Sequence, residues 1–333
     1  MSPSSSSAGI SPTWNEIHAP DGPSAAGISP TGNEIHGPVD PTGPALALGS
    51  DSRSRQARDH VARILVWLAF LVALAPLVWI LWSVVSQGYH LLLDADWWTH
   101  SQKGITARRE GGGAVHAIQG TLLQGAVTAA ISVPLAVLTA IYLVEYGRGK
   151  LARTVSFMVD ILTGIPSIVA GLFIYAVWVT TLGFQRVGFA VSLSLVLLMV
   201  PTVVRSTEEM LKLVPNELRE ASYALGVPKW KTIVKVVLPT ALSGIVTGIL
   251  LGLARVMGET APLLILGPYT KSIASDLFGG YMATLPTMIN QDRTESLQPA
   301  VDRVWAAALT LILLILILNL AGRLVARLGS VRK

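Results

Sequence analysis

Six long apolar runs dominate this chain, and they constrain its fold more than any other feature. A stretch of roughly 20 mainly apolar residues can cross the hydrocarbon core of a membrane as a helix. Each run is too long for a buried strand. The runs cover residues 61–85, 118–144, 155–182, 187–204, 241–267 and 304–325. We therefore expect an all-α integral membrane protein with six transmembrane helices.

Composition supports the membrane class and argues against enzymes. Apolar residues make up 51% of the 333-residue chain and charged residues only 14%, whereas about a quarter of a soluble domain is charged. Cysteine is absent, which excludes disulfides, cysteine metal sites and a thiolate nucleophile. The spans contain no histidine–glutamate metal motif and no paired aspartates. We expect a protein that is not an enzyme.

The basic residues predict how the spans are oriented. Lys and Arg are enriched in short cytoplasmic loops of membrane proteins. They cluster in the flanks 53–63, 148–153, 205–235 and 323–333. With six spans these four flanks fall on one side, so both termini are expected to be cytoplasmic in a multi-pass protein of the cell membrane. The net charge of +5 then reflects these flanks, and no nucleic-acid partner is predicted.

The first 60 residues differ in kind from the rest. They are rich in Ser, Pro and Gly, and the segment 9–18 (GISPTWNEIH) recurs almost unchanged at 27–36, 18 residues later. Such a sequence buries too little apolar surface to offset its ordering entropy. We expect a disordered cytoplasmic tail over 1–60, a transmembrane domain over 61–325 and a basic cytoplasmic tail over 326–333. The repeated histidines are only a weak metal signal.

The segment between the fourth and fifth spans predicts short helices. Asn216 can cap a helix, Gly226 stands where a C-terminal cap favours positive φ, and Pro228 prevents continuation. A further amphipathic stretch, 229–237, is expected to end at Leu238-Pro239. Two alternatives follow: a helix lying on anionic lipid, or a docking element for a cytoplasmic partner.

The fifth span contains two charged residues, Arg255 and Glu259. Each costs roughly 2.5–3.5 kcal/mol on insertion, so such residues normally face protein or a water-filled path. Their spacing of four predicts a common helix face. One alternative is an ion pair that locks helices together. The other is a charged point on a solute path, where the planar fork of arginine suits an oxyanion.

Polar residues in and after the third and fourth spans allow similar alternatives. Asp160, Thr163 and Ser167 are candidate path-lining residues, although Asp160 lies near the cytoplasmic end and can instead cap a helix or form a pair. Arg205 ends the fourth span, and we expect its long side chain to reach the membrane surface.

Two sequence patterns resemble a known family. Glu220-Ala221-Ser222, three residues, Gly226, nine residues and then 236–239 (VVLP) resemble the coupling loop of ABC importer permeases, with serine in place of an alanine and valine in place of an isoleucine. The resemblance implies the type I permease fold, with a cytoplasmic coupling helix that docks on an ATP-hydrolysing subunit. Glu220, Ala221, Ser222 and Gly226 would shape the docking turn. The chain has no phosphate loop of its own, so ATP and Mg would be bound by that partner and no cofactor by this chain.

Further strings resemble the phosphate-specific branch of these permeases. They include ARVMGETAPLL at 254–264, LTGIPSIVAG at 162–171 and EYG at 145–147, and the likeness covers roughly 110–325. This resemblance implies a phosphate importer made of two homologous permeases, an ATPase dimer and an external phosphate-binding protein. Sulfate or molybdate permeases remain alternatives because charge alone does not separate these anions. An ion-driven secondary carrier is a more distant alternative, since no inverted repeat is apparent.

Overall fold

The structure is a computed structural model that describes residues 53–331. Contacts divide the chain into Met1–Val66 and Trp67–Lys333, and the arrangement below is that of the second unit. Most of the predicted tail, with its repeated segment, lies outside the described residues. The described helices are α1 (Arg53–Leu92), α2 (Ala95–Thr99), α3 (Val115–Ile141), η1 (Tyr142–Tyr146), α4 (Gly149–Gly164), α5 (Ser167–Ile174), η2 (Tyr175–Thr181), α6 (Gly188–Lys212), α7 (Asn216–Ala224), α8 (Lys229–Thr232), η3 (Ile233–Val237), α9 (Leu238–Met257), α10 (Ala261–Leu266), α11 (Leu285–Asp292) and α12 (Gln298–Val331).

The spans are all helical, as the sequence predicts. Five described helices are long and apolar enough to cross a membrane, and a sixth span is obtained if α4 is counted with α5 and η2. The third span is therefore not the continuous helix that 155–182 predicts, because the chain bends by 108° between α4 and α5. The bend falls at Ile165 and Pro166, where proline disfavours helical φ/ψ in the residue before it.

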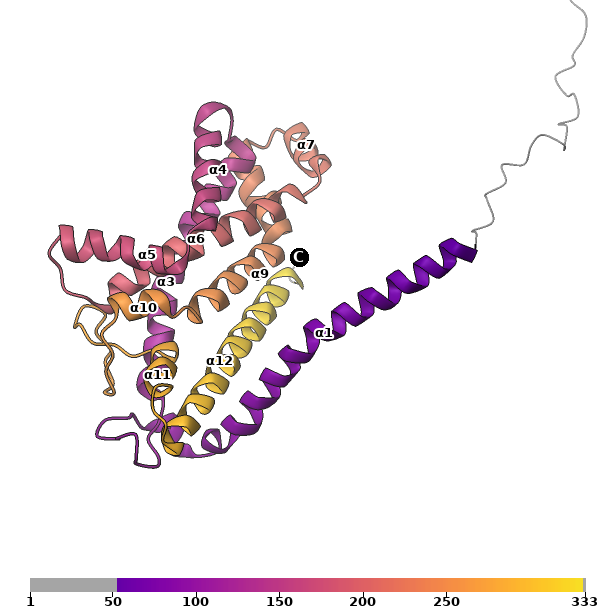
Figure 1. The fold of residues 1–333 in the computed structure, drawn as a ribbon. Helices are drawn as coiled ribbons and strands as arrows, with labels where there is room; N and C mark the ends of the chain where they lie inside the picture. Colours follow the sequence, from indigo (N-terminus) through magenta and orange to yellow (C-terminus); the bar gives the residue numbers. More distant parts are fainter. Residues whose placement is uncertain (1–52, 332–333) are drawn as a thin grey trace, which may run out of the picture. The chain divides into compact units, whose positions relative to one another are not determined.

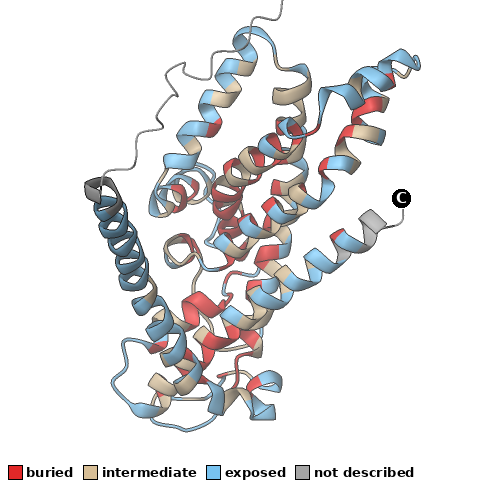
Figure 2. Cartoon of the chain, turned by 90° about the vertical axis from the view of Figure 1, so that its right-hand side faces the viewer, coloured by how far each residue is buried: buried red, intermediate tan, exposed pale blue. Residues whose placement is uncertain are grey.

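Helix α6 forms the centre of the core. Its inward side is buried over most of its length, and buried residues gather among the central helices (Figure 2). Helix α6 packs against both α3 and α9. Gly244, Gly248 and Gly252 of α9 permit the close approach to α6. A Cβ atom on Gly248 would lie 2.5 Å from Ser206 Cβ, and one on Gly252 would lie 3.1 Å from Val203 Cγ2. These small residues thus form the contact between α9 and α6.

Two further span boundaries differ from the sequence prediction. The fourth span continues as α6 to Lys212, so the charged residues after Val204 extend this helix and do not begin another. The stretch 229–237 does not end at Leu238-Pro239 either. It continues through η3 into α9, and Pro239 lies in the first turn of α9 after a π-helical turn.

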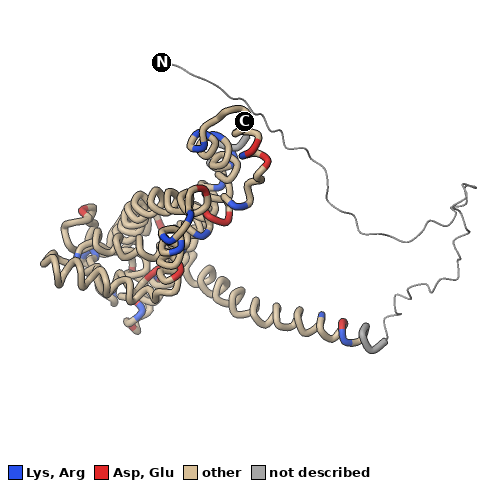
Figure 3. The backbone as a smooth tube through the Cα atoms, turned by 90° about the horizontal axis from the view of Figure 1, so that it is seen from above, with Lys and Arg blue, Asp and Glu red and all other residues tan. Residues whose placement is uncertain are grey.

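The two ends of the helical unit are built differently. At the α7 end, α7 lies near the junction of α3 and α4, and at the other end α11 packs on the start of α12 (Figure 1). We call these the α7 end and the α11 end. Charged residues gather at turns and helix ends, with long uncharged stretches between them (Figure 3). This distribution is the one that a lipid-embedded helical protein requires.

A buried polar network fixes the α11 end. Asp292 accepts hydrogen bonds from Arg303 Nε at 3.3 Å and from Gln102 Nε2 at 3.1 Å. Tyr269 donates to Gln102 Oε1 at 3.3 Å, and burial, reinforced by the Asp292 carboxylate, raises the pKa of the Tyr269 hydroxyl above its usual value. Arg303 also donates to the Arg109 carbonyl at 3.0 Å. Residues from two loops and from helices α11 and α12 are therefore held together away from the α7 end.

Candidate coupling surface and solute path

Helix α7 ends in a turn that glycine makes possible. Gly226 has φ +73°, its amide donates to Tyr223 O at 2.9 Å, and the Val227 amide donates to Ser222 O at 3.2 Å. These two bonds form a Schellman motif, which satisfies carbonyls that the helix end leaves open. Pro215 before α7 and Pro228 before α8 separate the short helices. The predicted C-cap role of Gly226 is confirmed.

The predicted coupling residues divide between an exposed side and a buried one. Glu220 and Ala221 are exposed, together with Tyr223 and Leu225, and Leu225 keeps 83% of its surface. Ser222 instead faces inward, 7% exposed. These four exposed residues, with Trp230, form what we call the coupling surface. An exposed group of large apolar side chains next to one acid is suited to a protein partner.

Arginine 219 attaches α7 to the rest of the molecule. Its Nη2 lies 3.0 Å from Glu145 Oε1 at the end of η1. The guanidinium also donates to Leu211 O at 3.0 Å and to Val214 O at 2.6 Å. The side chains of Arg219 and Glu145 are only 13% and 6% exposed. This pair joins segments that are 74 residues apart.

A second arginine joins α6 to α4. Arg205 forms an ion pair with Asp160 and donates to Ser156 Oγ at 2.9 Å. Its Nη1 lies 2.5 Å from Glu208 Oε2, and Glu208 pairs with Lys212 at 2.7 Å. Two carboxylates thus hold the Arg205 guanidinium, and the expectation that Arg205 extends to the membrane surface stays a prediction. Asp160 adopts the pairing alternative in this structure.

The two charged residues of the fifth span lie at a break in the helix. Helix α9 ends at Met257 and α10 begins at Ala261, so Glu259 lies outside both helices. The predicted common helix face is therefore wrong. Arg255 is exposed and Glu259 is half-buried, and among the described residues no ion pair joins them. The chain forms a turn at Gly258 and Glu259. Residues four apart share a face only in a continuous helix, so the spacing of Arg255 and Glu259 does not place them on one face.

Thr163 and Ser167 flank the bend of the third span. Thr163 is exposed, and its hydroxyl donates to Val159 O at 2.9 Å within α4. Ser167 is half-buried and begins α5 beyond Pro166. The bend places these two residues on different helices. They are not brought together with Arg255 by any hydrogen bond in the described part of the chain.

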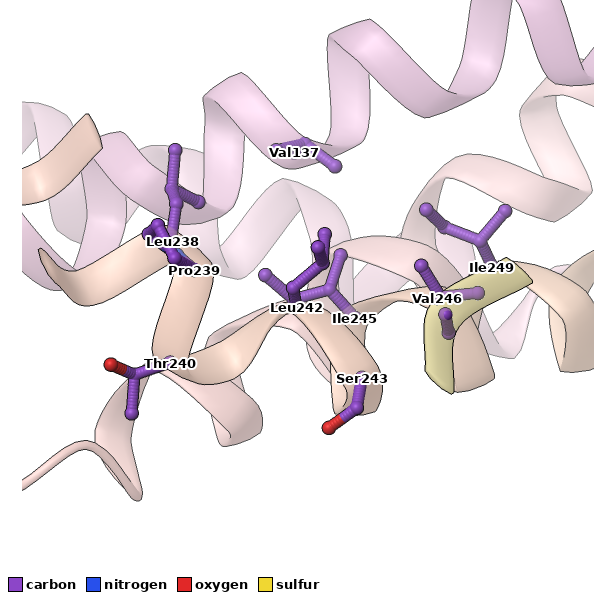
Figure 4. Close-up of a pocket in the computed structure, with 10 residues that line it drawn as sticks. Val137, Leu238, Pro239, Thr240, Leu242, Ser243, Ile245, Val246 and Ile249 are labelled. Atoms are coloured by element: carbon purple, nitrogen blue, oxygen red, sulfur yellow. The ribbon is translucent and has the colours of Figure 1, made fainter. Parts of the chain in front are cut away.

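An apolar groove of about 500 Å³ lies along the start of α9 (Figure 4). Val137 of α3, Ala326 of α12 and α9 residues from Leu238 to Ile249 line it. The hydroxyl of Ser243 points away from Val137 in Figure 4. None of the residues that line this groove is charged, so it is not the predicted charged site.

Comparison with known proteins identifies the family. The family model of the binding-protein-dependent transport system inner membrane component matches residues 132–328. The chain belongs to this family. The matched region of this inner membrane component runs from the middle of α3 to near the end of α12, and it contains both the coupling surface and Arg255.

Curated relatives of this inner membrane component are named for phosphate transport. It is 52% identical over 279 residues to the phosphate transport system permease protein PstA 1 of Mycobacterium tuberculosis strain H37Rv, which covers 84% of this chain and 91% of the relative. It is 53% identical over 278 residues to PstA of Mycobacterium leprae, with 84% and 91% covered. It is 40% identical to PstA of Yersinia pestis, with 81% and 90% covered. The predicted resemblance is confirmed.

Solved structures agree on the fold. A chain of a bacterial alginate ABC transporter, in complex with its alginate-bound periplasmic protein, superposes with a TM-score of 0.56 at 14% identity, over 84% of this chain and 99% of that one. The expected ABC importer permease fold is therefore confirmed, and the chain is a multi-pass membrane permease.

Sequence reasoning missed the partners of the two arginines. Glu145 belongs to the family string EYG at 145–147, and no sequence pattern given above singles out Glu208. Their signal was the presence of acids beside basic cytoplasmic flanks, but nothing in the sequence indicates which acid meets which base across 74 residues.

Proposed function

We propose that this chain is the transmembrane permease subunit of an ATP-driven inorganic phosphate importer and forms half of its translocation path. The observation that carries the proposal is the 52% identity, over 84% of the chain, to a permease named for phosphate transport. The second half of the path is a homologous permease, and an external phosphate-binding protein delivers the solute.

Energy comes from a separate ATPase dimer that docks on the coupling surface. The exposed side of α7, from Glu220 to Leu225, supports this assignment because the Gly226 turn presents it away from the helical core. ATP and Mg belong to that partner. This chain catalyses no chemical step; nucleotide and loaded binding protein each favour particular conformers, which couples the two equilibria.

The solute path passes the break between α9 and α10. Irregular backbone at membrane depth is tolerated only where protein or a water-filled cavity surrounds it. Arg255, one turn before the break, is exposed and without an ion-pair partner in the described residues. A free guanidinium donates two parallel hydrogen bonds to an oxyanion. Glu259 keeps the empty path near neutral, and Thr163 and Ser167 line it on the α4–α5 side.

The protein functions in the bacterial inner membrane with both termini and the coupling surface in the cytoplasm. The basic flanks at 148–153 and 205–235 support this orientation. Sulfate or molybdate is the alternative solute, because an arginine recognises each of these oxyanions. An ion-driven carrier would need no coupling surface.

Uptake of radiolabelled phosphate into proteoliposomes that contain the full complex tests the proposal. Uptake should require ATP inside and binding protein outside, and excess sulfate should not compete. The Arg255→Gln variant should assemble normally and lose most of its uptake. Uptake by this chain alone without ATP would establish the carrier alternative.

A further inference from the structure

The segment Glu145–Gly147 has no role in the proposal above, yet the coupling helix α7 is fixed to it. We infer that Glu145 is a positioning residue through which movement of α7 reaches span α3, and that Arg219 is its counterpart on α7. This inference rests on the proposed function, because it assigns the route by which an ATPase bound at the coupling surface would move the path.

Burial makes the Glu145–Arg219 pair a strong connection. The two side chains are 6% and 13% exposed, and the closest N···O distance is 3.0 Å. A second guanidinium nitrogen, Nε, donates to the same Glu145 oxygen at 3.2 Å. Exposed ion pairs contribute little, whereas removal of one partner from a buried pair leaves an uncompensated charge. We therefore expect Glu145 and Arg219 to move together.

Arg219 reaches three elements at once. Besides Glu145 it donates to Leu211 O in α6 and to Val214 O in the connection to α7. It also lies 3.3 Å from Asn216 Oδ1. One side chain thus fixes α7 to both neighbouring helices, and the fork of donors that arginine alone offers is used in full.

Lysine 229 holds the same turn from the other side of the coupling segment. Its ammonium donates to the Glu145 carbonyl and lies 4.7 Å from the centre of the Tyr146 ring. A Cβ atom on Gly147 would lie 2.6 Å from Leu143 O, so the turn is closed tightly. Residues on both sides of the Gly226 turn, Arg219 and Lys229, therefore converge on one short segment.

The segment continues directly into a membrane span. Tyr142, at the junction of α3 and η1, keeps helical dihedral angles (φ −58°, ψ −49°), and η1 covers Tyr142–Tyr146, so the helix runs without a break from α3 to Glu145. Helix α3 has 27 residues, about 40 Å at 1.5 Å per residue. Near its far end, Thr121 Oγ1 accepts from the Leu285 amide at 2.9 Å. A displacement of α7 can thus be carried along α3 to the α11 end.

The test uses the full complex in proteoliposomes, with phosphate uptake and ATP hydrolysis measured together. For Glu145→Gln we expect normal assembly, an unchanged KM for loaded binding protein and about a tenfold lower maximal uptake, in the range of ordinary coupling free energies. Phosphate transported per ATP should also fall. Glu209→Gln is the matched control: it removes an exposed acid of α6 whose side chain forms no ion pair among the described residues.

A double variant separates coupling from folding. Glu145→Gln combined with Arg219→Gln leaves no unpaired buried charge, so the complex should assemble while uptake per ATP stays low. Wild-type uptake per ATP in either the assembled single variant or the double variant would overturn the inference. If the wild-type complex itself took up no phosphate, the proposed function would fail, which is a different result.

Discussion

The hydroxyl groups of Ser222 and Thr232 lie 2.8 Å apart and form a buried hydrogen bond between α7 and α8. Ser222 is 7% exposed and Thr232 is fully buried. The bond spans the Gly226 turn and fixes the angle between the two helices. The serine that departs from the family pattern thus stabilises the coupling surface from behind and is not itself part of that surface.

We expect Thr232→Val to destabilise the protein more than Ser222→Ala. Valine leaves the buried Ser222 hydroxyl without this partner, at a cost of about 1–3 kcal/mol. In Ser222→Ala, Thr232 keeps a second acceptor, Pro228 O at 3.4 Å, so the loss should be about 0.5–1.5 kcal/mol. Melting temperatures of the purified protein in detergent measure both. An equal decrease in melting temperature for both variants would show that an unpaired Ser222 hydroxyl does not add to the loss of stability.

Gly226→Ala should weaken association with the ATPase subunit. A Cβ at this position meets no atom within 4 Å, so the cost is the left-handed conformation alone, about 1–2 kcal/mol. Gly226→Asn should cost less, because asparagine tolerates this conformation. Co-purification of the two variants with the ATPase gives the comparison. Equal co-purification of the Gly226→Ala and Gly226→Asn variants would show that the positive φ of residue 226 does not determine association with the ATPase.

Gly248→Ala should disturb the packing of α9 on α6. The added Cβ would lie 2.5 Å from Ser206 Cβ, and overpacking of this kind costs about 1–3 kcal/mol. Gly164→Ala is the control, since a Cβ there meets nothing within 4 Å. A lower melting temperature only for Gly248→Ala is expected. Unchanged stability in both variants would contradict the close approach.

Arg303→Met should be among the most destabilising substitutions. Arg303 and Asp292 are 1% and 5% exposed, and loss of one buried partner costs about 3–5 kcal/mol. Adding Asp292→Asn should recover much of the stability, because asparagine carries no charge and still accepts from Gln102. Thermal unfolding of the single and double variants tests this. If Asp292→Asn recovers no stability in the Arg303→Met background, the unpaired Asp292 charge is not the cause of the destabilisation.

Tyr269 should remain protonated at a pH where other tyrosines ionise. Its pKa is raised from the usual 10.0 by burial, with a further contribution from Asp292. The folded state then holds its proton more tightly than the unfolded state. This stabilisation is complete below pH 10 and is lost as pH rises through the folded-state pKa. Ultraviolet titration of the wild type against Tyr269→Phe should show no difference just above pH 10; ionisation of Tyr269 there would exclude the burial effect.

The sequence predicts which segments enter the membrane but not where they break. Long apolar runs are a direct requirement of the lipid, so all six spans could be found. Proline occurs in five of them, yet α1, α3 and α6 continue through Pro76, Pro134 and Pro201. The third span instead bends by 108° at Pro166, and the fifth is interrupted before Pro262, between α9 and α10. Neighbouring helices decide whether a freed carbonyl is satisfied in place, and one sequence does not contain that information.

In the candidate site too, some residue roles could be predicted from the sequence and others could not. The role of Gly226 follows from local backbone chemistry, so the sequence alone could assign it. The pairing of Arg219 with Glu145 depends on how α7 lies against η1, which is a tertiary property. The spacing of Arg255 and Glu259 misled the prediction because it assumed an unbroken helix.

The π-helical turn at Ile233–Val237 gives the chain a place where its length can change. Such a turn holds one residue more than an α-helical turn closed by the same neighbours. Deleting a single residue there would convert the π-helical turn to an α-helical turn. The helices on either side would then keep their orientation about the helix axis. The glycines of α9 would still meet α6, and α7 would still meet η1. Homologous chains that differ by one residue at this position can therefore keep both contacts without compensating changes elsewhere.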